Sequence, residues 1–407
     1  MTERRIAITG MGAVSAFGLG AQALWRGLRA GTSAIAPLRH PEAERLRVRV
    51  AAQVPANYDP AALFDEHSLP LLDRTTQFAL LAAREAIAQS GLVFDRDGLG
   101  LRSAVVVGSG LGGETTRDEQ DRKLYAENAS RLHPLTIVRA MMNATASQIS
   151  MAHGLRGPAF VVASACASSN HALAQAAQLI RAGTVDVAVS GGADACLSLG
   201  TLRAWEAMRV LADETCRPFS ANRRGLVLGE GAGMVVLEAM EHAQARGAPI
   251  LAEFAGAGMS ADAGDIVAPD PQGAAAAMRA ALADAGLDPT QIGYINAHGT
   301  ATQANDISET RAIRLVFGAH ADRLAVSSTK SMHGHAMGAS GALELLATVQ
   351  ALREGVLPPT ANYDAPDPAC DLDYVPNQAR ACAVQAALSN SFAFGGLNAV
   401  LVLRRAA

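Results

Sequence analysis

The chain has 407 residues, of which 50% are hydrophobic and 18% are charged, and this composition excludes a disordered protein. Aromatic residues make up only 4%, so Ala, Leu, Val and Gly must build most of the core. A net charge of -4 gives no electrostatic reason to expect nucleic acid or an anionic membrane as a partner.

The sequence contains no run of about 18 uninterrupted apolar residues that would predict a membrane span. Its first residues lead into a predicted strand and not into a signal peptide, so we expect a cytoplasmic protein. The odd number of cysteines and the lack of a CxxC pair argue against a disulfide framework or a zinc ribbon. The cysteines, each of which could simply be a small buried side chain, are Cys166, Cys196, Cys216, Cys370 and Cys382.

Short runs rich in β-branched residues alternate with Ala-rich helical stretches along the chain, which is typical of an α/β fold. The strands predicted in the first half are 5–9, 103–108, 160–162, 185–190 and 233–238. Those predicted in the second half are 251–258, 292–297, 324–327, 386–389 and 399–404, with a helix over 342–353. Because no Pro-rich or Ser-rich linker intervenes, we expect two fused halves, 1–255 and 256–407, that share one core. The polar insertion 112–135 is predicted to be a surface excursion or a subunit contact.

Cys166 lies where a predicted strand turns through small residues into the Ala-rich helix predicted over 172–182. Small neighbours permit a tight strand-to-helix turn, and the positive end of the helix dipole favours the thiolate. These features are those of a nucleophile, although a buried structural cysteine explains the segment equally well.

His298 directly follows the strand predicted over 292–297, at the position where α/β folds place reacting groups. A single histidine there is more often structural. Asp306 and Glu309 lie three residues apart and therefore close to one helix face, where they could anchor a cation. A solvated helix face is the simpler interpretation of this pair.

The segment 327–342 combines Lys330 with the imidazoles of His333 and His335 among several glycines. A metal site there would need a ligand from a distant part of the chain, so we expect no metal. Near the C-terminus, the segment 390–398 offers free backbone N–H groups beside the rings of Phe392 and Phe394. This combination suits an oxyanion hole with a hydrophobic gate.

The order Cys166, His298, Lys330, His335 and then the loop at Phe394 resembles the β-ketoacyl-acyl-carrier-protein synthases of the KAS II type, in the thiolase superfamily. The resemblance covers nearly the whole chain, including segments 8–15, 154–158, 217–219 and 228–233 outside the site. It implies a thiolase-like fold, in which two similar α/β halves form a layered αβαβα structure, and an enzyme without a cofactor. It also explains the Gly10-Met11-Gly12 segment, which lacks the third glycine and the acidic partner of a dinucleotide loop.

The resemblance further implies an acyltransferase that condenses an acyl thioester with malonyl carrier protein. Cys166 would carry the acyl chain, and His298 and His335, both neutral, would activate the malonyl thioester. Lys330, paired to the carboxylate of Glu309, would order the site. The expected partners are acyl- and malonyl-loaded acyl carrier protein and either a second copy of the chain or a ketosynthase-like chain-length factor.

The backbone N–H groups of Cys166 and Phe394 would hold the oxyanion, and the Phe394 ring would gate the acyl pocket. The other substrate contacts that the resemblance implies are two pantetheine-binding hydroxyls, a residue of the acyl pocket, a second aromatic ring and a basic docking residue. These are Thr300, Thr302, Leu111, Phe392 and Arg209. The role of His333, which stands where the family commonly has Thr, is left open.

Several positions depart from the usual pattern of the family, among them Ser220, Ala393 and Leu397. Segments 216–220 and 391–399 look more like nodulation protein E and the synthases of aryl polyene clusters, which favours a specialised pathway over housekeeping fatty-acid synthesis. Val267 replaces an expected hydroxyl near pantetheine, and segment 64–70 lacks the basic cluster used for carrier docking.

The main alternative is a non-catalytic chain-length factor, which shares the fold but lacks the reactive cysteine. Cys166 and the two histidines argue against this alternative. A thiolase that uses coenzyme A is a weaker rival, because Cys370 and Cys382 lie outside the second-half motif of that class. An NAD-binding protein is weaker still.

Overall fold

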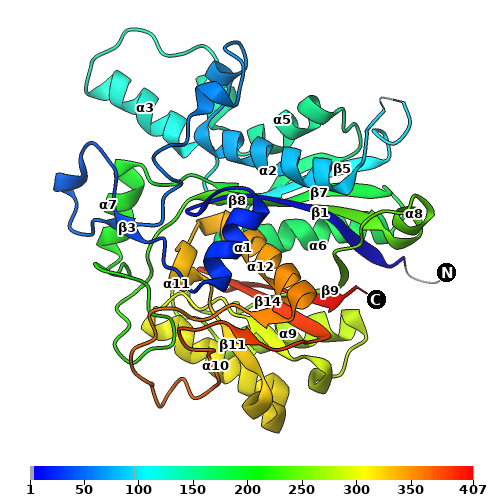
Figure 1. Cartoon of the computed structure of the whole chain (residues 1–407). Coiled ribbons are helices and arrows are strands. Elements are labelled where there is room, and N and C mark those ends of the chain that lie inside the picture. Colours follow the sequence, from blue (N-terminus) through cyan, green and yellow to red (C-terminus); the bar gives the residue numbers. More distant parts are fainter. Residues whose placement is uncertain (1–3, 96, 407) are drawn as a thin grey trace.

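The computed structural model describes residues 4–95 and 97–406 (Figure 1). Each strand predicted from the sequence is present. The N-terminal half contributes β1 (Ile6–Ser15), β5 (Ser103–Gly108), β6 (Ala159–Val162), β7 (Val187–Asp194) and β8 (Gly231–Ala239). The C-terminal half contributes β9 (Ala252–Ala261), β10 (Tyr294–Asn296), β11 (Ala325–Ser327), β14 (Ala386–Ala393) and β15 (Leu397–Arg405).

The two halves repeat one strand order and one set of strand directions. The order is β6-β5-β7-β8-β1 in the first half and β11-β10-β14-β15-β9 in the second. In each half the first three strands run parallel, and the last two pair antiparallel to their neighbours. A short antiparallel pairing of β1 with β9 joins the halves into one sheet. The proposed boundary between residues 255 and 256 lies within β9.

Helices cover both faces of each half. α6 (Ser168–Arg181) and α12 (Ser340–Glu354) pack between the two halves, and residues 340–352 of α12 are all buried. α2 (Arg74–Ser90) and α5 (Ala144–His153) cover the outer face of the first half, while α9 (Pro271–Ala285) and α10 (Gln303–Phe317) cover that of the second (Figure 1). This succession of layers is the αβαβα architecture expected from the sequence.

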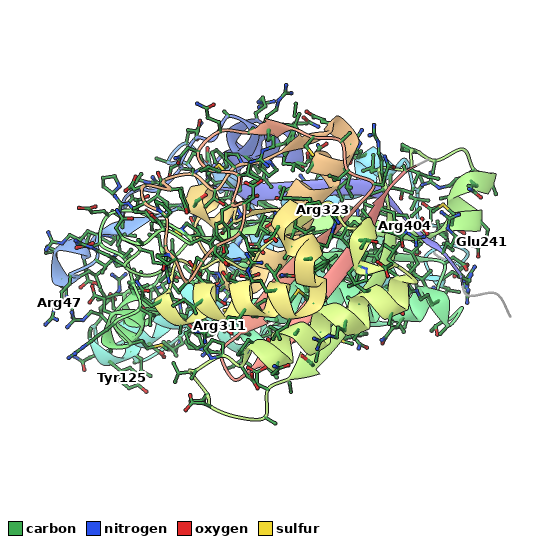
Figure 2. The ribbon with its side chains drawn as sticks, turned by 90° about the horizontal axis from the view of Figure 1, so that it is seen from below. Arg47, Tyr125, Glu241, Arg311, Arg323 and Arg404 are labelled. Atoms are coloured by element: carbon green, nitrogen blue, oxygen red, sulfur yellow. The ribbon has the colours of Figure 1, made fainter. Side chains whose placement is uncertain are left out.

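The remaining elements lie at the periphery or in connections. Tyr125, at the end of α3, and the charged side chains of Arg47 and Glu241 lie at the edges of the molecule (Figure 2). The polar insertion 112–135 contains α3, whose charged side chains are all exposed or partly exposed, as a surface excursion requires. The elements that lie at the periphery or in connections are α1 (Ala21–Arg29), β2 (Gly18–Leu19), β3 (Ala36–Pro37), β4 (Val50–Ala51), α3 (Glu114–Tyr125), α4 (Thr136–Ala140), α7 (Leu199–Ala207), α8 (Met240–Ala245), α11 (Lys330–His333), β12 (Val356–Leu357) and β13 (Arg380–Ala381).

Gly10 and Gly12 belong to β1, which passes directly beneath α2. A Cβ atom at Gly10 would lie 2.0 Å from the carbonyl oxygen of Ala86, and one at Gly12 would lie 2.2 Å from that of Ala82. These glycines therefore allow close packing of a helix on a strand and do not form a phosphate-binding loop. Among the described residues, no helix combines the length and the apolar character needed to cross a bilayer.

Candidate active site

Cys166 lies in a short 3₁₀ turn, Ala165–Ala167, between β6 and the N-terminus of α6. The residue before it, Ala165, has a φ of +47°, a left-handed conformation that is strained for a residue with a side chain. The neighbouring strand β5 packs closely on the start of α6, because a Cβ atom at Gly108 would lie 2.4 Å from the backbone of Ser168. The sequence thus builds a nucleophile elbow, with the sulfur buried at its tip.

Two imidazole rings from the second half converge on this sulfur. His298 follows β10 and His335 follows α11, and their candidate ring nitrogens and the Cys166 sulfur all lie within 4.8 Å of one another. The two rings are nearly perpendicular, with centroids 5.6 Å apart. In the described part of the chain, these side chains form the one group of three His, Cys, Asp or Glu residues close enough to ligate a metal ion.

Hydrogen bonds determine which nitrogen of His335 carries the proton. The backbone N–H of Met337 donates to Nδ1 of His335 at 3.1 Å, and the Ser340 hydroxyl lies 2.8 Å from the same atom. Because Nδ1 accepts a backbone N–H, the proton must reside on Nε2. Burial, together with the charge of Lys330, lowers the pKa of His335 well below its ordinary value, so the ring is neutral.

His298 has the same protonation pattern for a different reason. The Nζ atom of Lys330 lies 3.4 Å from Nδ1 of His298, and a lysine ammonium can only donate. Nε2 therefore carries the ring proton. Burial and the positive charge of Lys330 lower the pKa of His298 well below 6.5. Both rings consequently offer an N–H donor from Nε2.

The structure corrects the predicted partner of Lys330. Its ammonium forms an ion pair with Glu344 of α12, and both side chains are fully buried. Glu309 is occupied elsewhere: its oxygens accept the backbone N–H groups of His298 at 2.9 Å and Gly299 at 2.8 Å, and the Asn390 amide at 3.0 Å. Glu309 thus holds the loop of His298, while Glu344 neutralises the lysine.

Asp306 and Glu309 do not form the solvated helix face that the sequence favoured. Both are buried. Asp306 accepts the backbone N–H of Phe219 at 2.7 Å and that of Ala301 at 3.2 Å, and burial raises the pKa of Asp306 to about 7. The face is therefore used to fix backbone around the site and is not exposed to water.

Burial also dominates the chemistry of Cys166. It raises the pKa of the thiol to about 11, although the charge of Lys330 and the backbone N–H groups of Cys166 and Phe394 act in the opposite direction. The position at a helix N-terminus therefore does not make the resting group a thiolate. The same two N–H groups point to where an oxyanion would form beside the sulfur.

A cavity of about 120 Å³ connects the catalytic group to the surface. Thr300 and Thr302 line it, with their hydroxyl oxygens 3.0 Å apart, and Phe392 lies against the His298 ring. Val267 also lines the cavity, so an apolar side chain stands where a hydroxyl was expected. The pantetheine-binding residues predicted from the sequence are thus brought to one channel together with Cys166.

The other predicted substrate residues lie around this channel. Phe394 lines it and packs against Trp205, with ring centroids 5.9 Å apart. Leu111 belongs to the same apolar cluster as Phe394 but does not line the cavity. Arg209 is exposed and directly precedes Val210, which lines the channel.

His333 lies in the core and does not line the cavity. Its Nε2 atom is 3.0 Å from the hydroxyl of Thr329, and burial lowers the pKa of His333 to about 3. Glu344 was missed by sequence reasoning, although one signal was available. It is the single charged residue in the apolar helix segment 341–349, where a buried charge requires a partner.

Comparisons with known proteins agree with this geometry. Residues 3–243 match Beta-ketoacyl synthase, N-terminal domain, and residues 251–364 match Beta-ketoacyl synthase, C-terminal domain. The chain is 51% identical to Nodulation protein E of Rhizobium sp. (strain N33), over 99% of this chain and 100% of that protein. It is 41% identical to 3-oxoacyl-(acyl-carrier-protein) synthase 2 of Coxiella burnetii (strain RSA 493 / Nine Mile phase I), over 100% of this chain and 99% of that protein.

Solved structures match over the full length as well. The ishigamide ketosynthase/chain length factor has a TM-score of 0.94 and 36% identity, with 100% of both chains covered. A type II PKS acyl-carrier protein in complex with its ketosynthase bound to the hexaketide gives a TM-score of 0.90 and 30% identity, again with 100% of both chains covered. The resemblance found in the sequence is confirmed, and the chain belongs to the β-ketoacyl synthase family.

Proposed function

We propose that this protein catalyses the decarboxylative condensation of an acyl thioester with malonyl-acyl carrier protein. The observation that carries the proposal is the convergence of the Cys166 sulfur with two neutral imidazoles whose Nδ1 atoms are both occupied. A nucleophile beside two N–H donors serves a reaction that forms a covalent acyl intermediate and then an enolate.

In the first half-reaction, the Cys166 sulfur attacks the carbonyl carbon of the acyl-carrier thioester. The oxyanion accepts hydrogen bonds from the backbone N–H groups of Cys166 and Phe394. The carrier thiolate then leaves and takes up the proton that the Cys166 thiol gives up, so the acyl group moves from one sulfur to another. Because burial raises the thiol pKa to about 11, this proton is lost only as the thioester reacts.

In the second half-reaction, malonyl carrier protein enters the same channel and loses carbon dioxide. The electron pair of the broken bond forms an enolate on the thioester oxygen, which accepts the Nε2–H groups of His298 and His335. The enolate carbon attacks the acyl-Cys166 carbonyl and expels the sulfur. The product is a β-ketoacyl carrier protein with two more carbons than the primer.

We propose that Lys330 and Glu309 orient His298, the first through Nδ1 and the second through the loop backbone. Thr300 and Thr302 would bind the pantetheine arm, Phe392 would pack beside it, and Arg209 would meet the acidic carrier at the channel mouth. The ketosynthase complex with an acyl-carrier protein among the structural relatives supports this choice of partner. No cofactor is needed for these steps.

The greater identity to Nodulation protein E than to the synthase 2 of Coxiella burnetii favours a specialised acyl chain over housekeeping fatty-acid synthesis. We place the reaction in the cytoplasm, where carrier-bound intermediates are available. All five cysteines are free, which fits a reducing compartment. A chain-length factor role is disfavoured because Cys166 and both histidines are present and converge.

The protein should be a dimer, either with a second copy or with a chain-length factor. β6 forms an edge of the sheet with Phe160 partly exposed. The neighbouring helices α4 and α5 and the residue after α4 expose Ile137, Val138, Met151 and Met141. An unpaired strand edge beside exposed apolar side chains is typical of an interface. Light scattering of the purified chain should give about twice 42.0 kDa. A fully active species at 42.0 kDa would contradict this prediction.

Leu111 and Phe394 should control the length of the acyl chain. Because Leu111 and Phe394 pack against the same apolar cluster, Leu111→Phe should overpack this region and slow long primers by about 5- to 150-fold while sparing short ones. Leu111→Ala is the matched control and should keep long primers. Rates measured with primers of graded length show whether Leu111 limits chain length. An equal loss on every primer would show that Leu111 only fills the core.

The proposed reaction is tested by incubating the protein with malonyl carrier protein and a panel of acyl-carrier primers. Mass spectrometry of the carrier should reveal β-ketoacyl products for some primers. If the chain alone extends no primer, and extension by the chain with its partner subunit survives Cys166→Ala, the chain-length factor is the better assignment.

A further inference from the structure

Asp194, the last residue of β7, is a fully buried carboxylate that the proposed chemistry does not use. Burial raises its pKa to about 6, while hydrogen-bond donors lower it. Each of its oxygens accepts two hydrogen bonds. Oδ1 accepts from the Ser109 hydroxyl at 2.9 Å and the Leu111 N–H at 3.3 Å, whereas Oδ2 accepts from the Gly110 N–H at 2.8 Å and the Gly338 N–H at 2.6 Å.

These donors belong to two loops that have different tasks. Ser109, Gly110 and Leu111 follow β5, and Leu111 packs against the same apolar cluster as Phe394, which lines the channel. Gly338 follows Met337, whose backbone N–H fixes the proton of His335 on Nε2. Met337 has a φ of +50°, so this backbone conformation needs support from its surroundings. Asp194 is therefore hydrogen bonded to the acyl-pocket loop on one side and to the His335 loop on the other.

The two loops are also in direct contact at this point. A Cβ atom at Gly338 would lie 2.5 Å from the Gly110 nitrogen and 2.6 Å from Asp194 Oδ2. A Cβ atom at Gly110 would lie 3.8 Å from the carbonyl oxygen of Ala165, the residue before the nucleophile. A shift of the Leu111 loop therefore cannot leave the His335 loop in place unless the hydrogen bonds of Asp194 are broken.

We propose that Asp194 is a positioning residue that couples the acyl pocket to the decarboxylating histidine. An acyl chain on Cys166 displaces or stabilises the Leu111 loop. Asp194 passes this change in loop position to the Met337 N–H, and the Met337 N–H in turn sets the position of Nε2 of His335. Malonyl carrier protein is then decarboxylated at a rate that depends on the chain already bound, which limits wasteful loss of carbon dioxide. This inference rests on the proposed condensation.

Asp194→Asn tests the coupling with little change of shape. The amide nitrogen must face one of the two donor pairs, so at least one backbone N–H loses its acceptor and meets another donor. Decarboxylation on acyl-Cys166 should fall about 5- to 150-fold in kcat, which corresponds to the cost of an unsatisfied buried donor. Acylation of Cys166 by a short primer should remain near the wild-type rate.

The dependence of decarboxylation on chain length distinguishes this coupling from a merely structural role, which would leave the dependence unchanged. In the wild type, the rate should differ between short-acyl and long-acyl Cys166, and in Asp194→Asn this difference should disappear. The matched control is Asp186→Asn, which lies just before the other end of β7 and is ion paired with Arg4 and Arg102. This control should change only the thermal midpoint.

Ser109→Ala provides a second, milder variant if Asp194→Asn does not fold. It removes one donor to Asp194 and the acceptor of the Gly112 N–H, and it leaves the Gly338 bond intact. It should weaken the chain-length dependence while leaving decarboxylation on short-acyl Cys166 unchanged. A wild type without chain-length dependence, or variants that lose acylation and decarboxylation equally, would overturn the coupling. A wild type that never elongates a primer would instead contradict the proposed function.

Discussion

Cys166→Ala should abolish acyl-enzyme formation and condensation while malonyl carrier protein is still decarboxylated. The alanine removes the sulfur that lies within 4.8 Å of both imidazoles, so condensation should fall on the order of 10⁴- to 10⁶-fold. His298 and His335 keep their Nε2–H donors, because the bonds to Nδ1 from Lys330 and Met337 do not involve the cysteine. Intact-protein mass spectrometry measures the acyl-enzyme, and release of carbon dioxide measures decarboxylation.

Cys196→Ala is the matched control for this variant. Cys196 is as buried as Cys166, and burial raises the pKa of its thiol well above the ordinary value, yet it does not line the cavity. The control should therefore acquire the acyl group as the wild type does. Condensation by Cys166→Ala at the wild-type rate would contradict the covalent mechanism.

Glu344→Gln should strongly destabilise the protein and slow decarboxylation together. It leaves the Lys330 ammonium fully buried without a counter-ion, and breaking a buried ion pair in this way costs about 3–5 kcal/mol. Without Glu344 to anchor it, the Lys330 ammonium is no longer held in place to donate to Nδ1 of His298. Chemical denaturation measures the first effect, and carbon dioxide release at equal folded fraction measures the second.

The double variant Lys330→Met with Glu344→Leu separates stability from chemistry. Replacing both members of a buried pair by apolar residues removes the unpaired charge, so the free energy of unfolding should recover most of the loss. Decarboxylation should stay low, because Nδ1 of His298 has lost its donor. Recovery of both properties would show that the pair is only structural.

The strands and the fold class followed from the sequence because their signals are local. Runs such as Ser103–Gly108 are apolar and β-branched over their whole length, and the structure places β5 on these residues. The internal repeat of strand order was less accessible, since the sequence carries no obvious repeat. It depends on pairings such as β1 with β8, which join residues far apart in the chain.

The candidate site, like the fold, could be predicted from the sequence only where its signals are local. The positions of Cys166, His298 and His335 could be proposed from short motifs, and the structure brings them together. The partner of Lys330 could not be predicted from these motifs, because Glu344 reaches the lysine from a helix that the motif does not define. Glu309, the expected partner, instead accepts hydrogen bonds from backbone N–H groups. The helix dipole likewise predicted a thiolate at Cys166, but the dielectric environment, which depends on the whole tertiary structure, raises the pKa instead.

One measurement tests the central claim most directly. The wild-type protein is first loaded with an isotopically labelled acyl primer, and the peptide that contains Cys166 is analysed by mass spectrometry before and after addition of malonyl carrier protein. The covalent mechanism predicts that the label is on Cys166 before the addition. Afterwards it should leave that peptide and appear on the carrier in a β-ketoacyl chain two carbons longer. A labelled product that forms while Cys166 is never acylated, or a label that remains on Cys166 after malonyl carrier protein is added, would contradict the account.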